Sequence, residues 1–301
     1  MPETSKRLKV IINDLISKGK ISAKSRILMV NDGSKDKTWE IIEKLHEKDS
    51  VYSGIKLSHN QGHQNALLSG LMYAKDHCDM AISLDADLQD DIEAIEKMVD
   101  EYLKGSQIVY GVRSSRKKDT WFKRTTAEGF YKFMQFLGVD IVNNHADYRL
   151  MSKAALNALS EFKEVNLFLR GIVPLIGFKS SIVTYERNER FAGESKYPLK
   201  KMLSFAFDGI TSFSIRPIRV ITALGFIMFA GSILGLFWLL MLKLAGHTVQ
   251  GWTTLMGSVW FIGGIQILAL GIIGEYIGKI YKEVKARPRY IVEKIVDQVD
   301  G

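Results

Sequence analysis

Apolar and polar positions follow different patterns in the first 190 residues and in the rest of the chain. Up to residue 190, short β-rich apolar runs alternate with stretches of helical periodicity. The runs that predict strands are 26–30, 54–57, 80–84, 107–112 and 181–185. The stretches that predict helices are 4–17, 36–48, 62–77, 91–104, 121–137 and 152–160. This alternation predicts an α/β domain, with a mostly parallel sheet that helices cover on both faces.

Two long uncharged runs follow, at residues 220–242 and 255–274. They hold 23 and 20 residues, and a helix of that length, rising about 1.5 Å per residue, spans the core of a bilayer. Two buried helices of a soluble core are the alternative, which the lack of charge disfavours. Lys and Arg residues flank the pair on both outer sides, whereas the link 243–251 carries one Lys. Because positive flanks stay in the cytoplasm, we expect a transmembrane hairpin in a multi-pass protein of the cytoplasmic membrane, with both termini cytoplasmic.

The segment just before this hairpin has the pattern of an amphipathic helix. Apolar residues recur at helical spacing over 199–213, opposite polar positions that include Lys200 and Asp208. This pattern predicts a helix that lies on the membrane surface. The expected organisation is a cytoplasmic domain at 1–196, a juxtamembrane amphipathic helix at 197–217, a transmembrane hairpin at 218–280 and a cytoplasmic tail at 281–301.

Composition narrows the range of partners. The chain carries 41 Lys and Arg against 33 Asp and Glu, a net charge of +8, which suits an anionic membrane surface or a phosphorylated ligand. No zinc-finger spacing or aromatic RNA-binding motif accompanies this charge, so no nucleic-acid partner is expected. Cys78 is the single cysteine, which excludes a disulfide-stapled scaffold. The long apolar runs exclude an intrinsically disordered chain.

The clearest candidate chemistry follows the predicted strand 80–84. Asp85 and Asp87 stand two residues apart at the carboxyl end of that strand, where sheets of this type bind their ligands. Two carboxylates turned toward one point suit Mg²⁺ or Mn²⁺ held jointly with a diphosphate. Asp90 and Asp91 are interpreted as charges at the start of the next helix rather than as ligands.

Four other polar positions need an interpretation of their own. A capped turn accounts for the residues around Asp32, but not for Asp32 itself. Asp147 either caps the helix predicted at 152–160 or belongs to the site. His59 and His63 have helical spacing without a third ligand, so neither is interpreted as a metal ligand.

Basic residues form two groups. One follows the predicted strand 107–112 and begins with Arg113, and the other, with Arg190 and Lys196, directly precedes the predicted amphipathic helix. Such residues are usually solvated. The second group stands where the domain must meet the membrane, so we expect it to bind a lipid phosphate.

Several motifs occur in one order along nearly the whole chain. They are Asn31-Asp-Gly-Ser-Lys-Asp36, Asn60-Gln-Gly-His-Gln-Asn-Ala-Leu67 and Asp85-Ala-Asp-Leu-Gln-Asp90. These motifs resemble the family 2 glycosyltransferases of GT-A fold. The run Ala146-Asp147-Tyr-Arg-Leu-Met-Ser152, the loop Gly193-Glu-Ser-Lys196 and the C-terminal hairpin narrow the resemblance further. In this combination the chain is similar to polyprenyl-phosphate glycosyltransferases, such as dolichyl-phosphate mannose synthase and bacterial undecaprenyl-phosphate glucosyltransferases.

The resemblance implies a Rossmann-like GT-A domain that transfers a sugar from a nucleotide-sugar donor, expected to be UDP-linked, to a polyprenyl phosphate at the cytoplasmic face. The family roles carried over are Asp32 and Asp85 for the nucleotide sugar, Asp85, Asp87 and Gln89 for the metal, Arg113, Arg190 and Lys196 for the acceptor phosphate, and Asp147 for catalysis. A phosphate monoester has a second pKa of about 6 and hardly needs a general base at neutral pH. We therefore expect Asp147 to position groups rather than to abstract a proton, in an in-line displacement that inverts the anomeric carbon. A homo-oligomer is left open.

The chain departs from the family pattern near its beginning. The family opens with a strand that lines the nucleotide site, but no apolar strand precedes the helix predicted at 4–17, and Asn31 stands where the family commonly has Asp. Either the sequence begins inside a longer protein, which we expect, or the pocket is incomplete.

Other functions remain as alternatives. A truncated or degenerate transferase that acts as a non-catalytic membrane scaffold is the first of them. A haloacid-type phosphatase also uses an Asp-x-Asp pair, but it carries the pair at its first core strand. Here two predicted strands precede the pair, so this function fits less well. A processive polysaccharide synthase fits less well too, because two spans leave little membrane structure for a polymer channel.

Overall fold

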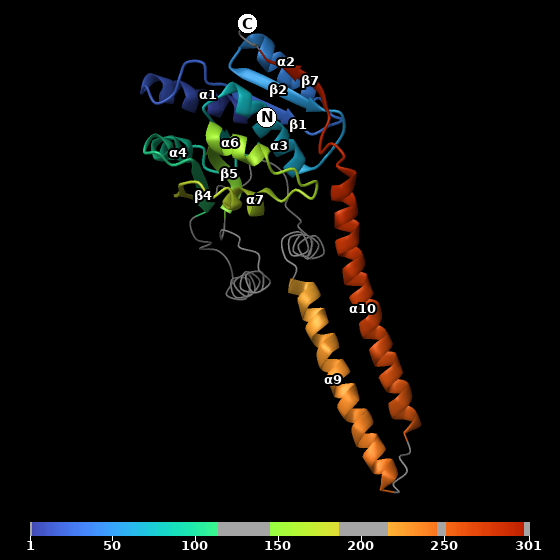
Figure 1. Ribbon diagram of the computed structural model, residues 1–301. Coiled ribbons are helices and arrows are strands. Elements are labelled where there is room, and N and C mark those ends of the chain that lie inside the picture. Colours follow the sequence, from blue (N-terminus) through green and yellow to red (C-terminus); the bar gives the residue numbers. More distant parts are fainter. Residues whose placement is uncertain (1, 114–144, 187–215, 246–250, 298–301) are drawn as a thin grey trace. The chain divides into compact units, whose positions relative to one another are not determined.

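The computed structural model describes residues 2–113, 145–186, 216–245 and 251–297 (Figure 1). These residues belong to two compact units. The first unit holds residues 2–113 and 145–186 together with the end of the chain from Ala286, and the second holds the two long helices up to Lys285.

The first unit alternates helices and strands along most of its length. Its helices are α1 (Pro2–Ser17), α2 (Thr38–Lys48), α3 (His63–His77), α4 (Ala94–Leu103), α6 (Lys153–Ser160) and α7 (Leu169–Leu175). Its strands are β1 (Ile27–Asn31), β2 (Tyr52–Leu57), β3 (Met80–Ser83), β4 (Ile108–Arg113), β5 (His145–Ser152), β6 (Ser180–Tyr185) and β7 (Val292–Val296). Each strand predicted from the sequence is present, and β5, β7 and α7 are additional. The helix predicted at 121–137 lies outside the described residues.

The strands form two sheets, a three-stranded one in the order β1-β2-β7 and a four-stranded one in the order β3-β5-β4-β6. Only β1 with β2 and β4 with β6 are parallel, whereas β5 and β7 run antiparallel to their neighbours. The α/β class is therefore confirmed, but the mostly parallel sheet is wrong for the described strands. The two strands that the sequence pattern missed are the two that run against the rest.

Strand β5 illustrates why it was missed. Its alternating side chains divide between a core face and a polar face, because Tyr148 and Leu150 pack in the main apolar cluster while Asp147 and Arg149 take the other side. Charged residues in a buried strand break the apolar signal. Ser152, rather than Asp147, caps the following helix: its Oγ accepts a hydrogen bond from the N–H of Ala155 at 3.1 Å.

The strands β1 and β3 each pair on one side only among the described residues. Helix α3 packs against both of them, so one helix connects the two sheets. On the other side, Leu8 of α1 contributes to the apolar clusters beneath both sheets. The expectation of a missing first strand stays a prediction.

The last strand, β7, returns the end of the chain to the first unit. It pairs antiparallel with β2, and Asp297 just beyond it accepts hydrogen bonds from Arg26, Ser53 and Tyr73 at 2.7, 2.5 and 2.6 Å. Part of the segment expected to be a tail is thus a sheet strand.

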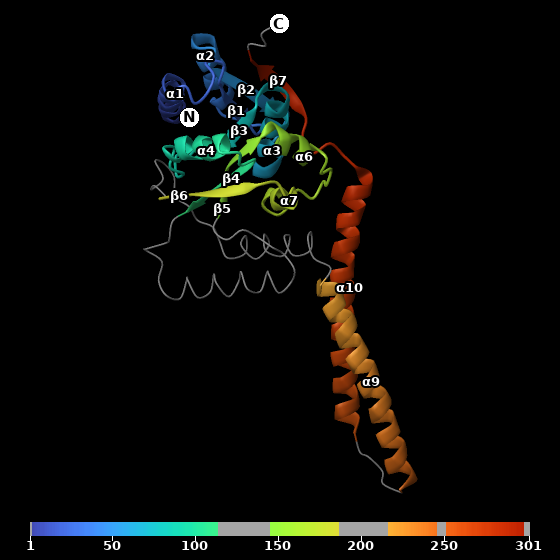
Figure 2. The same cartoon turned by 60° about the vertical axis from the view of Figure 1, so that its left-hand side comes forward.

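The second unit consists of α9 (Arg216–Leu244) and α10 (Trp252–Lys285). These helices contain the two predicted apolar runs, and they lie side by side in antiparallel directions in both views (Figures 1 and 2). Large apolar side chains such as Phe226, Trp238 and Leu268 are about two-thirds exposed or more, at 72, 66 and 65%. Within the described part of the chain, one stretch, Phe261–Lys285, is long and apolar enough to cross a membrane. The predicted amphipathic helix at 197–217 falls almost wholly outside the described residues.

Candidate functional site

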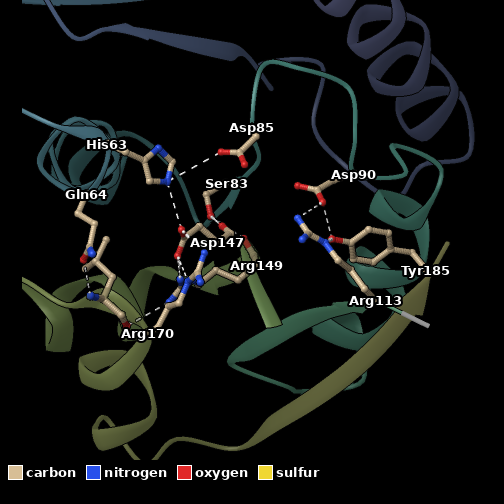
Figure 3. A network of polar contacts seen from close by, with 11 residues as sticks. His63, Gln64, Ser83, Asp85, Asp90, Arg113, Asp147, Arg149, Arg170 and Tyr185 are labelled. Carbon is tan, nitrogen blue, oxygen red and sulfur yellow. Dashed lines mark hydrogen bonds and ion pairs between the residues drawn. The ribbon is translucent and has the colours of Figure 1, made fainter. Parts of the chain in front are cut away.

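Asp147 lies at the centre of a cluster of charged side chains (Figure 3). Its Oδ1 accepts a hydrogen bond from Nη2 of Arg149 at 2.6 Å, and its Oδ2 accepts one from Nη2 of Arg170 at 3.1 Å. Arg149 stands two residues along β5, hence on the same face of the strand, and is 1% exposed, whereas the side chain of Arg170 on α7 is 36% exposed. One carboxylate thus sits between a buried guanidinium and an accessible one.

His63 connects this cluster to the Asp-x-Asp loop. It is the first residue of α3, and its Nε2 lies 3.1 Å from Oδ2 of Asp147 and 3.9 Å from Oδ1 of Asp85. Because an ionised carboxylate only accepts hydrogen bonds, Nε2 is the protonated nitrogen. The three side chains come from three separate elements, α3, β5 and the loop after β3.

The charges of this cluster set the pKa values of its members. Burial by itself would raise the pKa of Asp147, but the hydrogen bond from His63 and the charges of Arg170 and Arg149 outweigh it and hold that pKa well below its usual range. The hydrogen bond to Asp147 raises the pKa of His63. Burial raises the pKa of Asp85. Asp147 is therefore ionised at any physiological pH.

Hydrogen bonds to the backbone hold the cluster in place. The N–H of Leu169 donates to Oε1 of Gln64 at 2.9 Å, and the carbonyl of Leu169 accepts from Nη1 of Arg149 at 3.3 Å. Ser83 at the end of β3 donates to the carbonyl of Asp147 at 2.5 Å. These hydrogen bonds join β5 to the start of α7 and to the end of β3, and they join the start of α7 to the start of α3.

The Asp-x-Asp loop has an unusual backbone at Leu88, whose φ is +59°. A leucine in this left-handed region is strained, and the buried side chain of Leu88 keeps it there. The bend lets Oδ1 of Asp87 accept a hydrogen bond from the N–H of Gln89 at 3.1 Å. Gln89 itself is only 7% exposed. In the described part of the chain, no three His, Cys, Asp or Glu side chains gather in an arrangement that holds a metal ion.

Asp90 corrects an interpretation made from the sequence. It is not simply a charge at a helix start, because it is 2% exposed and accepts a hydrogen bond from the hydroxyl of Tyr185. Arg113 donates from Nη2 to Oδ1 of Asp90 at 3.3 Å and from Nε to the hydroxyl of Tyr185 at 3.2 Å. Asp91, by contrast, accepts from the N–H of Glu93 as expected near a helix start. Arg113 is thus bound to the segment that follows Gln89 (Figure 3).

Asp32 joins two loops. Its Oδ1 and Oδ2 accept hydrogen bonds from the N–H groups of Gln61 and Gly62 at 2.7 and 3.0 Å. The neighbouring Gly33 has a φ of +61°, and a Cβ added there would lie 2.3 Å from the carbonyl carbon of His59. Only glycine allows the two loops to approach this closely.

The structure brings together some of the residues selected from the sequence. Asp85 and Asp147 meet through His63, while Arg113 belongs to the neighbouring Asp90 group. Arg190 and Lys196 lie outside the described residues. The nucleotide, metal and acceptor roles of all these residues stay predictions.

Three members of the cluster were missed. The sequence pattern indicates only that His63 is not a metal ligand, and it points to neither Arg149 nor Arg170. For Arg149, the Asp147-x-Arg149 spacing was a usable signal, because residues two apart share a strand face once the segment is read as a strand. For Arg170, 23 residues away from Asp147, the sequence holds no such signal.

Comparison with known proteins identifies the two parts of the chain. The model of the glycosyl transferase family 2 matches residues 3–160, and that of the GtrB C-terminal hairpin matches residues 216–280. The chain is 55% identical to the uncharacterized glycosyltransferase YkoT of Bacillus subtilis, over 97% of this chain and 86% of that protein. It is 40% identical to the SfII prophage-derived bactoprenol glucosyl transferase of Shigella flexneri, over 89% and 87% of the two chains.

A further relative is the uncharacterized glycosyltransferase sll0501 of Synechocystis, 39% identical over 89% of this chain and 85% of that protein. The family match covers the segments that carry Asp32, His63, Asp85 and Asp147. On these grounds the chain belongs to the glycosyl transferase family 2 and is a glycosyltransferase.

Proposed function

We propose that this protein transfers a sugar from a nucleotide-sugar donor, UDP-linked, to a polyprenyl phosphate. The observation that carries the proposal is the cluster around Asp147, which places two guanidinium groups and an imidazole next to the acidic loop at Asp85. A reaction between two phosphate-bearing substrates needs cations on either side of the transferred group. The likeness to a bactoprenol glucosyl transferase over most of both chains supports a lipid phosphate as acceptor.

The reaction that fits these residues is an in-line displacement. An oxygen of the acceptor phosphate forms a bond to the anomeric carbon, and the bond from that carbon to the donor diphosphate breaks, with its electrons leaving on the nucleoside diphosphate. The configuration of the sugar is inverted. No proton needs to be removed, because the acceptor phosphate is already ionised. Asp147, whose pKa is lowered by its cationic neighbours, is correspondingly a poor proton acceptor and acts by orienting the groups around it.

Asp85 and Asp87 suit Mg²⁺ or Mn²⁺ as the ion on the donor side, and Gln89 follows them in the same loop. Two carboxylates are what Mg²⁺ ordinarily takes from a protein when substrate phosphates and water supply its other ligands. The ion would neutralise the charge of the leaving diphosphate. Partial burial and the nearby carboxylates of Asp90, Asp147 and Asp87 raise the pKa of Asp85, which fits this role because the loop lacks a full counter-charge in the free protein.

The apolar helices α9 and α10 are proposed to insert as a two-span hairpin in the cytoplasmic membrane. Their length, their exposed apolar side chains and the match to a C-terminal hairpin model support this. Basic residues beyond both outer ends favour a cytoplasmic position for the first unit and for both termini.

The test is a transfer assay in membranes that contain the full chain. Polyprenyl phosphate, Mg²⁺ or Mn²⁺ and a panel of labelled UDP- and GDP-sugars are supplied, and label in the lipid phase is measured. We expect label from a UDP-sugar, and its loss with Asp87→Ala and without the divalent ion. Asp76→Ala, which removes an exposed carboxylate far from the site, is the matched control and keeps the activity.

One result decides against this function. If no donor labels the lipid while the chain still binds nucleoside diphosphate, the non-catalytic scaffold becomes the better description. Among the described strands, β1 and β3 each pair on one side only, and this is the observation that favours that alternative.

A further inference from the structure

We infer that Arg170 binds the phosphate of the acceptor. The inference rests on the proposed function and deepens it, because it assigns the acceptor phosphate to a residue that neither the sequence motifs nor the family match points out. Its chemical class of ligand is a phosphate monoester dianion, and the lipid acceptor, rather than the donor diphosphate, is its source.

Asp147 has a counter-charge even without Arg170. Arg149 supplies it from a buried position, with Nη2 at 2.6 Å from Oδ1 of Asp147. Arg170 reaches the same carboxylate through longer bonds, at 3.1 Å from Nη2 and 3.4 Å from Nε. A second guanidinium on one carboxylate leaves an excess of positive charge, which an anionic ligand can balance.

Arg170 is accessible to a ligand, whereas Arg149 is buried. The side chain of Arg170 is 36% exposed and that of Arg149 is 1% exposed. The bonds of Arg170 to Asp147 use Nε and Nη2, and across the described ranges, 114–144 and 187–215 not included, its Nη1 makes no hydrogen bond. A guanidinium with free donors in a fixed plane matches the oxygens of a phosphate.

Neighbouring residues of the site set the position of Arg170. The N–H of the preceding residue, Leu169, donates to Gln64, and its carbonyl accepts from Arg149. Figure 3 shows Arg170 and Asp85 on different sides of Asp147, with His63 between the acidic loop and the cluster. An in-line displacement needs the attacking and the leaving groups on opposite sides of the sugar. If the donor diphosphate binds at Asp85, the attacking phosphate therefore binds on the side of Arg170.

The test compares Arg170→Gln and Arg170→Lys with the wild-type full chain in detergent. Initial rates are measured against polyprenyl phosphate at saturating donor, and against donor at saturating polyprenyl phosphate. We expect Arg170→Gln to raise the acceptor KM about tenfold or more and to leave the donor KM within about twofold. Arg170→Lys keeps the positive charge but loses the planar set of hydrogen-bond donors of the guanidinium. We therefore expect its acceptor KM to lie between those of the wild type and Arg170→Gln. Lys163→Gln, which removes an exposed charge from the segment between α6 and α7, is the control.

An unchanged acceptor KM in Arg170→Gln overturns the assignment, and so does an equal rise in the donor KM, because that result places the donor diphosphate at Arg170. A second measurement does not depend on turnover. Binding of farnesyl phosphate and of farnesol to the detergent-solubilised proteins is followed by calorimetry, and we expect the phosphate-dependent part of the affinity to be lost in Arg170→Gln.

The two hypotheses fail in different ways. If the wild-type chain labels no lipid from any donor, the proposed function fails, and farnesyl phosphate binding still decides the role of Arg170. If the wild-type chain is active and Arg170→Gln binds farnesyl phosphate equally well, the function stands and the assignment of Arg170 is wrong. Should Arg170→Gln not fold, Arg170→Lys carries the same comparison with a smaller expected effect.

Discussion

At the scale of single residues, the two aspartates that matter most have opposite environments. Burial raises the pKa of Asp85, while His63 and two arginines hold the pKa of Asp147 far down. The pairing of Asp85 with Asp87 could be predicted from the sequence, because both residues stand in one short loop. The neighbours of Asp147 could not be predicted, since they come from α3 and α7 as well as from its own strand.

Gly33 is expected to be indispensable for the joined loops at Asp32. Gly33→Ala places a Cβ 2.3 Å from the backbone of His59 at a positive φ, so the loops must separate. Gly19→Ala is a matched control, because Gly19 has a φ of +67° but no neighbour within 4 Å of its added Cβ.

We expect Gly19→Ala to cost about 1 kcal/mol from backbone strain alone, and Gly33→Ala to cost at least about 2 kcal/mol more. The measurement is chemical unfolding of both variants and of the wild-type protein. Equal costs would show that the close approach of the two loops contributes nothing.

His63 is expected to make stability depend on pH. The hydrogen bond to Asp147 raises the pKa of His63 above its ordinary value, and the charge of Asp85 acts in the same direction, against burial and the charge of Arg170. Its contribution is fully present below the unfolded pKa of about 6.5 and is lost as the pH rises through the folded pKa.

The check is the difference in Tm between wild type and His63→Gln, measured from pH 6 to pH 9. The difference should shrink as the pH rises, because the wild-type protein loses the charged form of His63. A constant difference for His63→Gln would contradict the charge-based explanation.

At the scale of elements, β7 is the clearest case of a segment whose role depends on the rest of the fold. The side chain of Asp297 beyond it is 8% exposed and accepts three hydrogen bonds, which lower its pKa although burial opposes them. Ion pairs of Lys56 with Glu293 and of Lys294 with Glu43 add weaker contacts at the surface.

Asp297→Asn is expected to destabilise the first unit by about 2 kcal/mol, because hydrogen bonds to a buried charge are the stronger kind. Asp76→Asn, which alters a carboxylate whose side chain is 67% exposed, is the control and should change the free energy of unfolding by less than about 0.5 kcal/mol. The measurement is the unfolding midpoint in denaturant. If both variants behave alike, β7 is held by its backbone pairing with β2 and not by Asp297.

The secondary-structure elements themselves were predictable where apolar pattern and position agreed. The apolar strands β1, β3, β4 and β6 and the helices α1 to α4 stand close to their predicted bounds. Strand β5 could not be found in this way, because Asp147 and Arg149 interrupt its apolar pattern. They are tolerated because they pair with each other, and Asp147 also pairs with His63 and Arg170. Strand β7 is short and mostly exposed, with Glu and Lys inside its five residues, and it is a strand through its pairing with β2.

At the scale of the whole molecule, the proposed hairpin makes a direct topological prediction. In a chain with Cys78→Ser, single cysteines are introduced at Gly251, between the two long helices, and at Arg287, after α10. In intact cells, a membrane-impermeant thiol reagent should label Gly251→Cys but not Arg287→Cys. Lysed cells should allow labelling of both positions, which is the control for reactivity. Labelling of neither position in intact cells, or of both, would contradict the two-span arrangement.

The α/β class, the apolar helices and the order of the motifs could be predicted, because they depend on local periodicity and on residues close together in the chain. The mixed sheets, the pairing of the end of the chain with β2, and the contacts of Asp147 with Arg149, Arg170 and His63 could be learned only from the folded protein. One cause is common to all three. The pairing of strands and the neutralisation of a buried charge are interactions between distant segments, and no local pattern of apolar and polar residues encodes which distant partner arrives.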